Sequence, residues 1–130
     1  MASLTAKPNA DGSVDLTGKQ GSTWSMTITL TDQVGAAFDL TGYSAAGMVR
    51  KTPSASAKTK DFVVTLSATP TDGTITVSMS ASDTAAITAG DSVDDDDSLY
   101  YYDVEITSGT GIVTRIIQGK LYIDPECTKA

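Results

Sequence analysis

Carboxylates are the residues of this chain whose spacing first points to a possible chemistry. Asp94, Asp95, Asp96 and Asp97 are consecutive and follow Asp91 closely, and loops rich in oxygen ligands are what Ca²⁺ binds. The run lacks the alternating D-x-D-x-D-G spacing that turns carboxylates inward, so its side chains point in different directions. We interpret it as a solvated acidic loop that is also a candidate for a weak Ca²⁺ site.

Catalysis is disfavoured by the residue types that are missing. The chain has no histidine, so the commonest general base is absent and Ser-His-Asp or Cys-His arrangements are excluded. Asp103 and Glu105 are two residues apart on a predicted strand and could in principle form a glycosidase pair, but this spacing is common on solvated strand faces. We therefore predict a protein that is not an enzyme, with no catalytic residue and no cofactor.

Three consecutive tyrosines could form an aromatic platform for a sugar. The segment 99–107 alternates in the manner of a strand, so Tyr100 and Tyr102 are expected to face the core while Tyr101 faces away from it. Tyr101, Asp103 and Glu105 then share the outward face, which is solvated or covered by a partner. These three residues are the predicted interface candidates.

Composition bounds the class of protein. A chain of 130 residues with 40% hydrophobic content is one domain, able to bury roughly 65–70% of its unfolded surface without a metal or disulfide. The net charge of −7 and the scattered Lys and Arg residues argue against nucleic acid and anionic membranes as partners. Cys127 is the single cysteine, which excludes a disulfide within the chain and leaves one between chains open.

Strand signals dominate the chain. Residues 23–31, 62–66, 74–80 and 99–107 alternate apolar and polar side chains, 36–40 is expected to be a short return strand, and 43–51 another strand. In 112–124 the phase changes at Ile116–Ile117, which indicates a β-bulge or a bend where the strand changes sheets. Segment 80–90 is the one helical candidate, with Ser80 and Asp83 spaced as in a capping box.

Asp and Gly residues mark three expected turns between the strands. These residues are Asp39 and Gly42, Asp72 and Gly73, and Gly109 and Gly111. The prediction is an all-β fold, an immunoglobulin-like antiparallel β-sandwich of seven or eight strands with one short helical crossover. The sandwich is expected over 20–126, preceded by an extended N-terminal arm over 1–19 and followed by a C-terminal tail over 127–130.

Four segments of the chain stand in a distinctive order: "QGSTWSMTITLTD" (20–32), "FDLTGYSAAGMVRK" (38–51), "DGTITVSMSASDTAAI" (72–87) and "YYYDVEITSGTGIVTRIIQGKLYIDPE" (100–126). This ordered set resembles a family of small tailed-phage virion proteins related to the N-terminal domain of the upper baseplate protein. The resemblance covers about residues 20–126. It implies an immunoglobulin-like sandwich that serves as an adaptor in a phage particle, with no catalytic residues.

The resemblance leads to a functional hypothesis: a structural adaptor or connector in the tail, neck or baseplate. Its expected partners are other virion proteins in many copies per particle, with a fibre or receptor-binding protein among the candidates. The N-terminal sequence has no apolar signal-peptide core, so synthesis in the host cytoplasm and residence in the virion are expected. The alternatives are a capsid decoration protein on the head exterior and a carbohydrate-binding module for host surface glycans.

Overall fold

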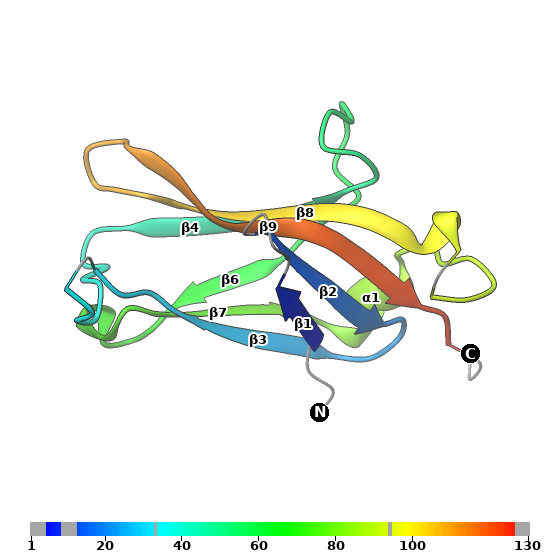
Figure 1. Cartoon of the computed structure of the whole chain (residues 1–130), viewed down its shortest axis with the longest axis horizontal. Coiled ribbons are helices and arrows are strands. Elements are labelled where there is room, and N and C mark those ends of the chain that lie inside the picture. Colours follow the sequence, from blue (N-terminus) through cyan, green and yellow to red (C-terminus); the bar gives the residue numbers. More distant parts are fainter. Residues whose placement is uncertain (1–4, 9–12, 33, 94, 127–130) are drawn as a thin grey trace.

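Two β-sheets packed face to face form the protein (Figure 1). The computed structural model describes residues 5–8, 13–32, 34–93 and 95–126. One sheet has six strands in the order β1-β2-β9-β8-β4-β5, and the other has three in the order β3-β7-β6. The strands are β1 (Thr5–Pro8), β2 (Val14–Lys19), β3 (Trp24–Thr29), β4 (Ser44–Arg50), β5 (Lys60–Asp61), β6 (Val63–Leu66), β7 (Thr74–Met79), β8 (Leu99–Thr107) and β9 (Val113–Asp124).

The helical elements are short. α1 (Ala81–Ala85) connects β7 of the smaller sheet to the segment that leads into β8 of the larger one, and the two 3₁₀ turns are η1 (Pro70–Asp72) and η2 (Asp96–Ser98). This arrangement confirms the predicted all-β sandwich with one short helical crossover. The pairs of neighbouring strands are antiparallel except for β2 with β9, which is parallel.

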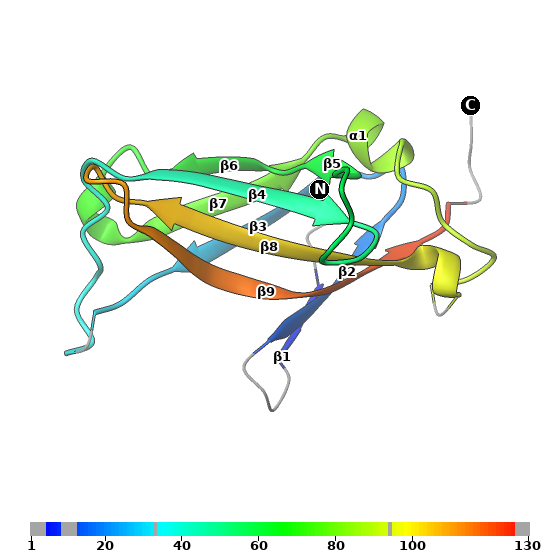
Figure 2. The same ribbon diagram turned by 90° about the horizontal axis from the view of Figure 1, so that it is seen from above.

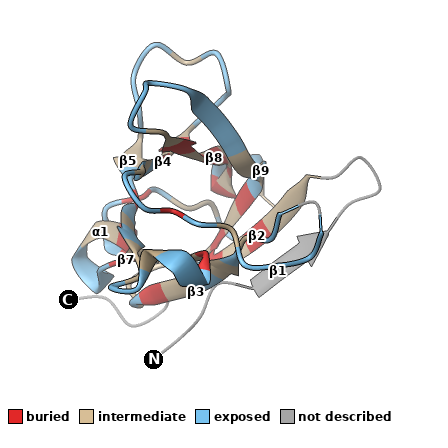
Figure 3. Ribbon diagram, turned by 90° about the vertical axis from the view of Figure 1, so that its left-hand side faces the viewer, coloured by how far each residue is buried: buried red, intermediate tan, exposed pale blue. Residues whose placement is uncertain are grey.

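Alternating side chains build the core between the sheets (Figure 3). Along β8 the even-numbered residues 100–106 are buried and the odd-numbered ones are partly exposed, as the sequence predicts. β7 buries Ile75, Val77 and Met79 in the same way. Removal of these apolar side chains from water is the main force that holds the two sheets together.

One extended segment passes from one sheet to the other. Lys60–Asp61 pairs with β4 in the larger sheet, and after Phe62 the chain continues as Val63–Leu66, which pairs with β7 in the smaller sheet. Phe62 is buried at this crossing, and its backbone N–H donates to the carbonyl of Gly47 at 2.9 Å. With β5 and β6 counted as one continuous segment, residues 5–8, 13–32, 34–93 and 95–126 form eight strands, within the predicted number.

Residues 14–19 belong to the sandwich, which therefore begins before the predicted boundary at residue 20. β2 pairs with β9 so that Leu16 lies opposite Leu121, and both side chains are fully buried. β1 continues the sheet beyond β2 (Figure 2). Residues 1–4 and 9–12 of the predicted arm, and the predicted tail 127–130 with Cys127, lie outside the described residues.

The return strand predicted over 36–40 is wrong. Only an isolated bridge between Thr31 and Ala37 forms there. The backbone hydrogen bonds of this segment are divided between two neighbours: Phe38 N–H donates to Leu30 and Leu40 N–H to Pro70, at 2.9 and 3.0 Å. Without a single partner strand the segment does not form a ladder, although Leu40 still contributes a buried side chain.

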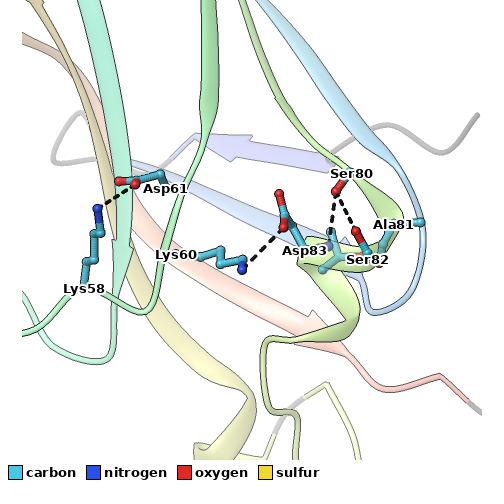
Figure 4. A network of polar contacts seen from close by, with 8 residues as sticks. Lys58, Lys60, Asp61, Ser80, Ala81, Ser82 and Asp83 are labelled. Atoms are coloured by element: carbon cyan, nitrogen blue, oxygen red, sulfur yellow. Dashed lines mark hydrogen bonds and ion pairs between the residues drawn. The ribbon is translucent and has the colours of Figure 1, made fainter.

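A polar network attaches the helix to the strand that changes sheets (Figure 4). The Ser80 hydroxyl accepts the backbone N–H of Asp83 at 3.2 Å, so Ser80 caps α1 as its sequence position predicts. The Asp83 carboxylate forms an ion pair with Lys60 of β5 at 3.4 Å, and Lys58 pairs with Asp61 at 2.6 Å. The Asp83 side chain thus ties α1 to β5.

Trp24 closes the sandwich on the side where β2 leads into β3. Its side chain is fully buried, and its indole N–H donates to the carbonyl of Lys19 at 2.8 Å. The ring lies directly over Gly18, where an added Cβ would overlap its atoms. The absence of a side chain at Gly18 is therefore a condition for the position of Trp24.

We expect Gly18→Ala to lower the free energy of unfolding by about 1–3 kcal/mol, because the new methyl group must displace the Trp24 ring. Chemical denaturation followed by the fluorescence of Trp24, the single tryptophan, measures the loss. Gly109→Ala is the matched control, since the nearest atom to an added Cβ there is the Gly42 carbonyl at 3.5 Å; its change should stay within about 0.5 kcal/mol. Equal losses in both variants would contradict the packing argument.

Candidate interaction surface

A hollow of about 650 Å³ lies on the outer face of the six-stranded sheet. We call it the outer hollow. It is formed by outward side chains of β4, β8 and β9, with Asp15 of β2 on one side and Pro53 of the loop 51–59 on the other. Figure 1 shows this loop rising above the sheet. All three interface candidates predicted from the sequence, Tyr101, Asp103 and Glu105, line the hollow.

Strand register arranges the lining in three rows across β4, β8 and β9. In the first row Tyr101 lies between Arg50 and Lys120. Side chains directly opposite each other on neighbouring strands are close enough to interact, with Cβ atoms about 4.5–5.5 Å apart. The second row is Met48, Asp103 and Gln118, and the third is Ala46, Glu105 and Arg115.

A β-bulge in β9 determines the third row. Val104 pairs with Ile117 whereas Glu105 pairs with Arg115, so Ile116 is an extra residue without a partner on β8. Arg115 and Gln118 therefore share a face although they are three positions apart, and the guanidinium Nη1 donates to Gln118 Oε1 at 2.8 Å. The structure confirms the bulge predicted at Ile116–Ile117, and β9 remains in one sheet throughout.

The charges of the outer hollow are only partly compensated. Asp103 pairs with Arg115 at 3.4 Å. Arg50 donates from Nη1 to the carbonyl of Ala55 at 3.0 Å and has no carboxylate partner in the described part of the chain. Among these same residues, the Lys120 ammonium, the Glu105 carboxylate and the Tyr101 hydroxyl form no hydrogen bond or ion pair. These groups are available to a ligand.

The floor of the hollow is fixed where β2 approaches β9. The Tyr102 hydroxyl donates to the carbonyl of Val14 at 2.6 Å, and an added Cβ on Gly119 would overlap that same carbonyl. Burial raises the pKa of Tyr102 well above its usual range, and the negative charge of Asp15 raises it further. Tyr102 is therefore a neutral donor that holds β2 in place rather than a reactive group.

One aspartate of the acidic loop, Asp95, shapes the loop backbone. Asp95 accepts the N–H groups of Asp97 at 2.9 Å and of Asp91 at 3.3 Å; these bonds lower its pKa, and the charge of Lys51 adds to the effect. Asp96 lies in η2 together with Asp97. Asp94 is outside the described residues, and within them no three acidic, His or Cys side chains gather in a way that could hold a metal ion.

Lys51 anchors the same loop to β8. Its ammonium donates to the carbonyls of Asp96 at 2.8 Å and Leu99 at 2.7 Å, and it lies 4.5 Å from the centre of the Tyr100 ring. A cation thereby satisfies the carbonyls of the first residue of η2 and of the residue that follows it. The loop is an ordered turn in which the Asp95 carboxylate accepts hydrogen bonds from the loop's own backbone.

The first predicted turn, which contains Asp39 and Gly42, lies directly before β4. Asp39 accepts the backbone N–H of Thr41 at 2.9 Å and its hydroxyl at 2.6 Å. These two bonds lower the pKa of Asp39, the hydroxyl contributing most. Gly42 then adopts a φ of 81°, a left-handed conformation that favours glycine. Both residues are structural and lie outside the hollow.

The second predicted turn connects β6 and β7. Asp72 accepts the Ser67 hydroxyl at 2.8 Å and the Thr74 N–H at 2.9 Å, which together lower its pKa. Gly73 has a φ of 70° and lies against the backbone of Leu30. In the β8–β9 turn, Gly111 has a φ of 91°, whereas Gly109 has no positive φ.

A second exposed feature is the open edge of β9. β2 pairs only with residues 121–124, so the edge of β9 that faces away from β8 has no strand partner over 113–118 in the described chain. At the start of this edge Ile112 and Val113 are 66% and 56% exposed. We call residues 112–118 the β9 edge. Sequence reasoning missed it, although the β-branched run Ile112-Val113-Thr114 was a signal for it.

Comparisons of the sequence with models of protein families and with curated proteins gave no match. None of the helices in the described ranges has the length and apolar character needed to span a bilayer. The outer hollow and the β9 edge are the two surfaces of the described residues that are suited to contact a ligand or a partner.

We expect Ser67→Ala to raise the pKa of Asp72 toward its ordinary value of 3.8, because the Ser67 hydroxyl is the largest cause of its lowering. Carboxyl ¹³C NMR titration measures the change, and Asp39, whose partner is Thr41, serves as the internal control. A lowered pKa stabilises the fold above pH 3.8 and this stabilisation is lost as the pH falls through the folded value. The variant should thus lose less stability on acidification; an unshifted Asp72 would disprove the assignment.

Proposed function

We propose that the protein is a non-enzymatic structural subunit of a tailed-phage virion, an adaptor or connector in the tail, neck or baseplate. The resemblance over about residues 20–126 supports this proposal, together with the β-sandwich in which its segments form strands and turns of the framework. Segment 38–51 contains the turn into β4, 72–87 contains β7 and α1, and 100–126 contains the β8–β9 hairpin.

The observation that carries the proposal is the β9 edge with its exposed apolar side chains. An unpaired strand edge offers a row of backbone donors and acceptors to a strand of another chain. The extra residue Ile116 interrupts this row, so a docked strand would pair with residues 113–115 and cover the hairpin tip.

The side chains of this edge provide the accompanying apolar contact. Ile112 and Val113 are two of the four large hydrophobic residues that are exposed in the described ranges. Burying such a side chain fully contributes about 1.5–3 kcal/mol. An interface of this size is weak for one subunit, and many copies per particle would strengthen it through avidity.

Mass spectrometry of purified particles of the phage that encodes the chain tests the proposal directly. The protein should be found in a stoichiometric ratio to the other structural subunits. Its absence from purified particles would refute the virion assignment, whatever the behaviour of the isolated protein.

Ile112→Lys should reduce incorporation into particles by about tenfold, the effect of losing about 1.4 kcal/mol of binding. Incorporation is measured by quantitative mass spectrometry of particles complemented with the variant. Val34→Lys is the matched control, because Val34 is an equally apolar side chain, 87% exposed, in a different turn. Both variants should unfold like the wild type. If Ile112→Lys and Val34→Lys incorporate equally, the β9 edge is not the docking surface.

A further inference from the structure

The first row of the outer hollow places an aromatic side chain between two cations. Arg50, Tyr101 and Lys120 lie directly opposite one another on β4, β8 and β9, and all three line the hollow. Neighbouring strands are about 4.8 Å apart, so the two cations lie on either side of the ring, each one strand away from it.

Among the residues that the structure describes, no direct ion pair neutralises the positive charge of this row. Arg50 uses one nitrogen for the carbonyl of Ala55 and another for a contact with Met48 Sδ at 3.8 Å, and a guanidinium has five N–H donors in all. Lys120 has no partner for its ammonium within the described residues. Asp15, at the β2 side, accepts the backbone N–H of Lys120 at 3.4 Å. Two charged donors therefore remain for an anionic ligand.

The rest of the hollow has the properties of a site for hydroxyl groups. Glu105 presents a carboxylate that makes no hydrogen bond among the described residues, and Gln118 has an amide NH₂ beside the Oε1 that binds Arg115. The Asp103–Arg115 ion pair and the Arg115–Gln118 hydrogen bond orient the Gln118 amide beside Glu105. A carboxylate accepts a hydrogen bond from a hydroxyl, and an amide NH₂ donates one to it.

We propose that the outer hollow binds an acidic saccharide. One sugar ring packs against Tyr101, its carboxylate lies between Arg50 and Lys120, and hydroxyls of the ring or of its neighbour bind Glu105 and Gln118. The volume of about 650 Å³ is in the range of roughly 300–1,000 Å³ that small-ligand sites occupy. The hollow shares Arg115 and Gln118 with the β9 edge, but its anion-binding row of Arg50, Tyr101 and Lys120 lies outside that edge. The saccharide proposal does not depend on the virion assignment.

The surrounding carboxylates select against other anions. Asp15, Asp103 and Glu105 line the same hollow as the cations, and the protein has a net charge of −7. A polyphosphate carries at least one negative charge on every phosphate group, and the carboxylates and the negative net charge repel it. A saccharide with a single carboxylate and several neutral hydroxyls is compatible with two cations bordered by acidic groups.

NMR titration of the full ¹⁵N-labelled chain tests the proposal. The probes are trigalacturonic acid and 3′-sialyllactose, with the methyl ester of the former and lactose as uncharged counterparts, and hexaglutamate as an acidic peptide. We expect saturable shifts of the Tyr101 and Lys120 amides with an acidic saccharide, at least about tenfold weaker binding of its uncharged counterpart, and no saturation with the peptide.

Single substitutions test whether the first row of the hollow binds the acidic saccharide. Arg50→Gln and Lys120→Gln should each weaken binding of the acidic saccharide about tenfold or more, for loss of a charge-assisted hydrogen bond. Tyr101→Ala should weaken it about two- to tenfold, for loss of the packed ring. Lys58→Gln is the control, since Lys58 pairs with Asp61 and does not line the hollow, and it should bind as the wild type does. Trp24 fluorescence reports that each variant is folded.

The outcomes decide the proposal in either direction. It is overturned if neither acidic saccharide binds, if the uncharged counterparts bind equally well, if hexaglutamate binds better, or if the shifts lie outside the hollow. Because the protein can fail this titration and still be present in particles, or succeed and be absent from them, the saccharide site and the virion assignment fail independently.

Discussion

The extra residue in β9 is the constraint on which both faces of the larger sheet depend. β9 has 12 residues, and a strand of this length with strict alternation would need its apolar residues at every second position. The sequence instead has Ile112, Thr114 and Ile116 in one phase, and Ile117, Leu121 and Ile123 in the other. The bulge at Ile116 lets the second set face the core while Arg115, Gln118 and Lys120 all face outward. Core and outer hollow therefore follow from the same irregularity.

Two glycines make the parallel pairing of β2 with β9 sterically possible. Gly119 leaves room for the carbonyl of Val14, which accepts the Tyr102 hydroxyl, and Gly18 leaves room for the Trp24 ring. The backbone of β2 is thus held from both layers, by a tyrosine of the larger sheet and a tryptophan of the smaller one. This attachment places Asp15 beside Lys120 and forms one side of the hollow.

The sequence pattern predicted those features of the fold that depend on residues close together in the chain. The alternation in β7 and β8, the Ser80 cap and the phase change in β9 are all contained within a few consecutive residues. The parallel pairing of β2 is not, because it joins residues more than 100 positions apart and Val14-Asp15-Leu16 gives only a short strand signal. For the same reason the sequence placed Tyr101 on the outward face but could not place Arg50 and Lys120 beside it. Segment 36–40 has strand-like residues, but its hydrogen bonds go to two different neighbours.

The first row of the outer hollow and the start of the β9 edge lie at different places on the same hairpin, which determines how they can be used together. Tyr101 is near the start of β8, and the β9 edge begins beyond its end at Thr107, near the opposite end of the molecule from η2 (Figure 2). Six residues of strand span roughly 20 Å. Exposed ion pairs such as Asp103–Arg115 contribute little to stability, so the outward side chains of β8 and β9 are not needed to hold the sheets together. A subunit bound to a neighbour through its hairpin tip would therefore keep the first row of the hollow open to solvent and to a small ligand.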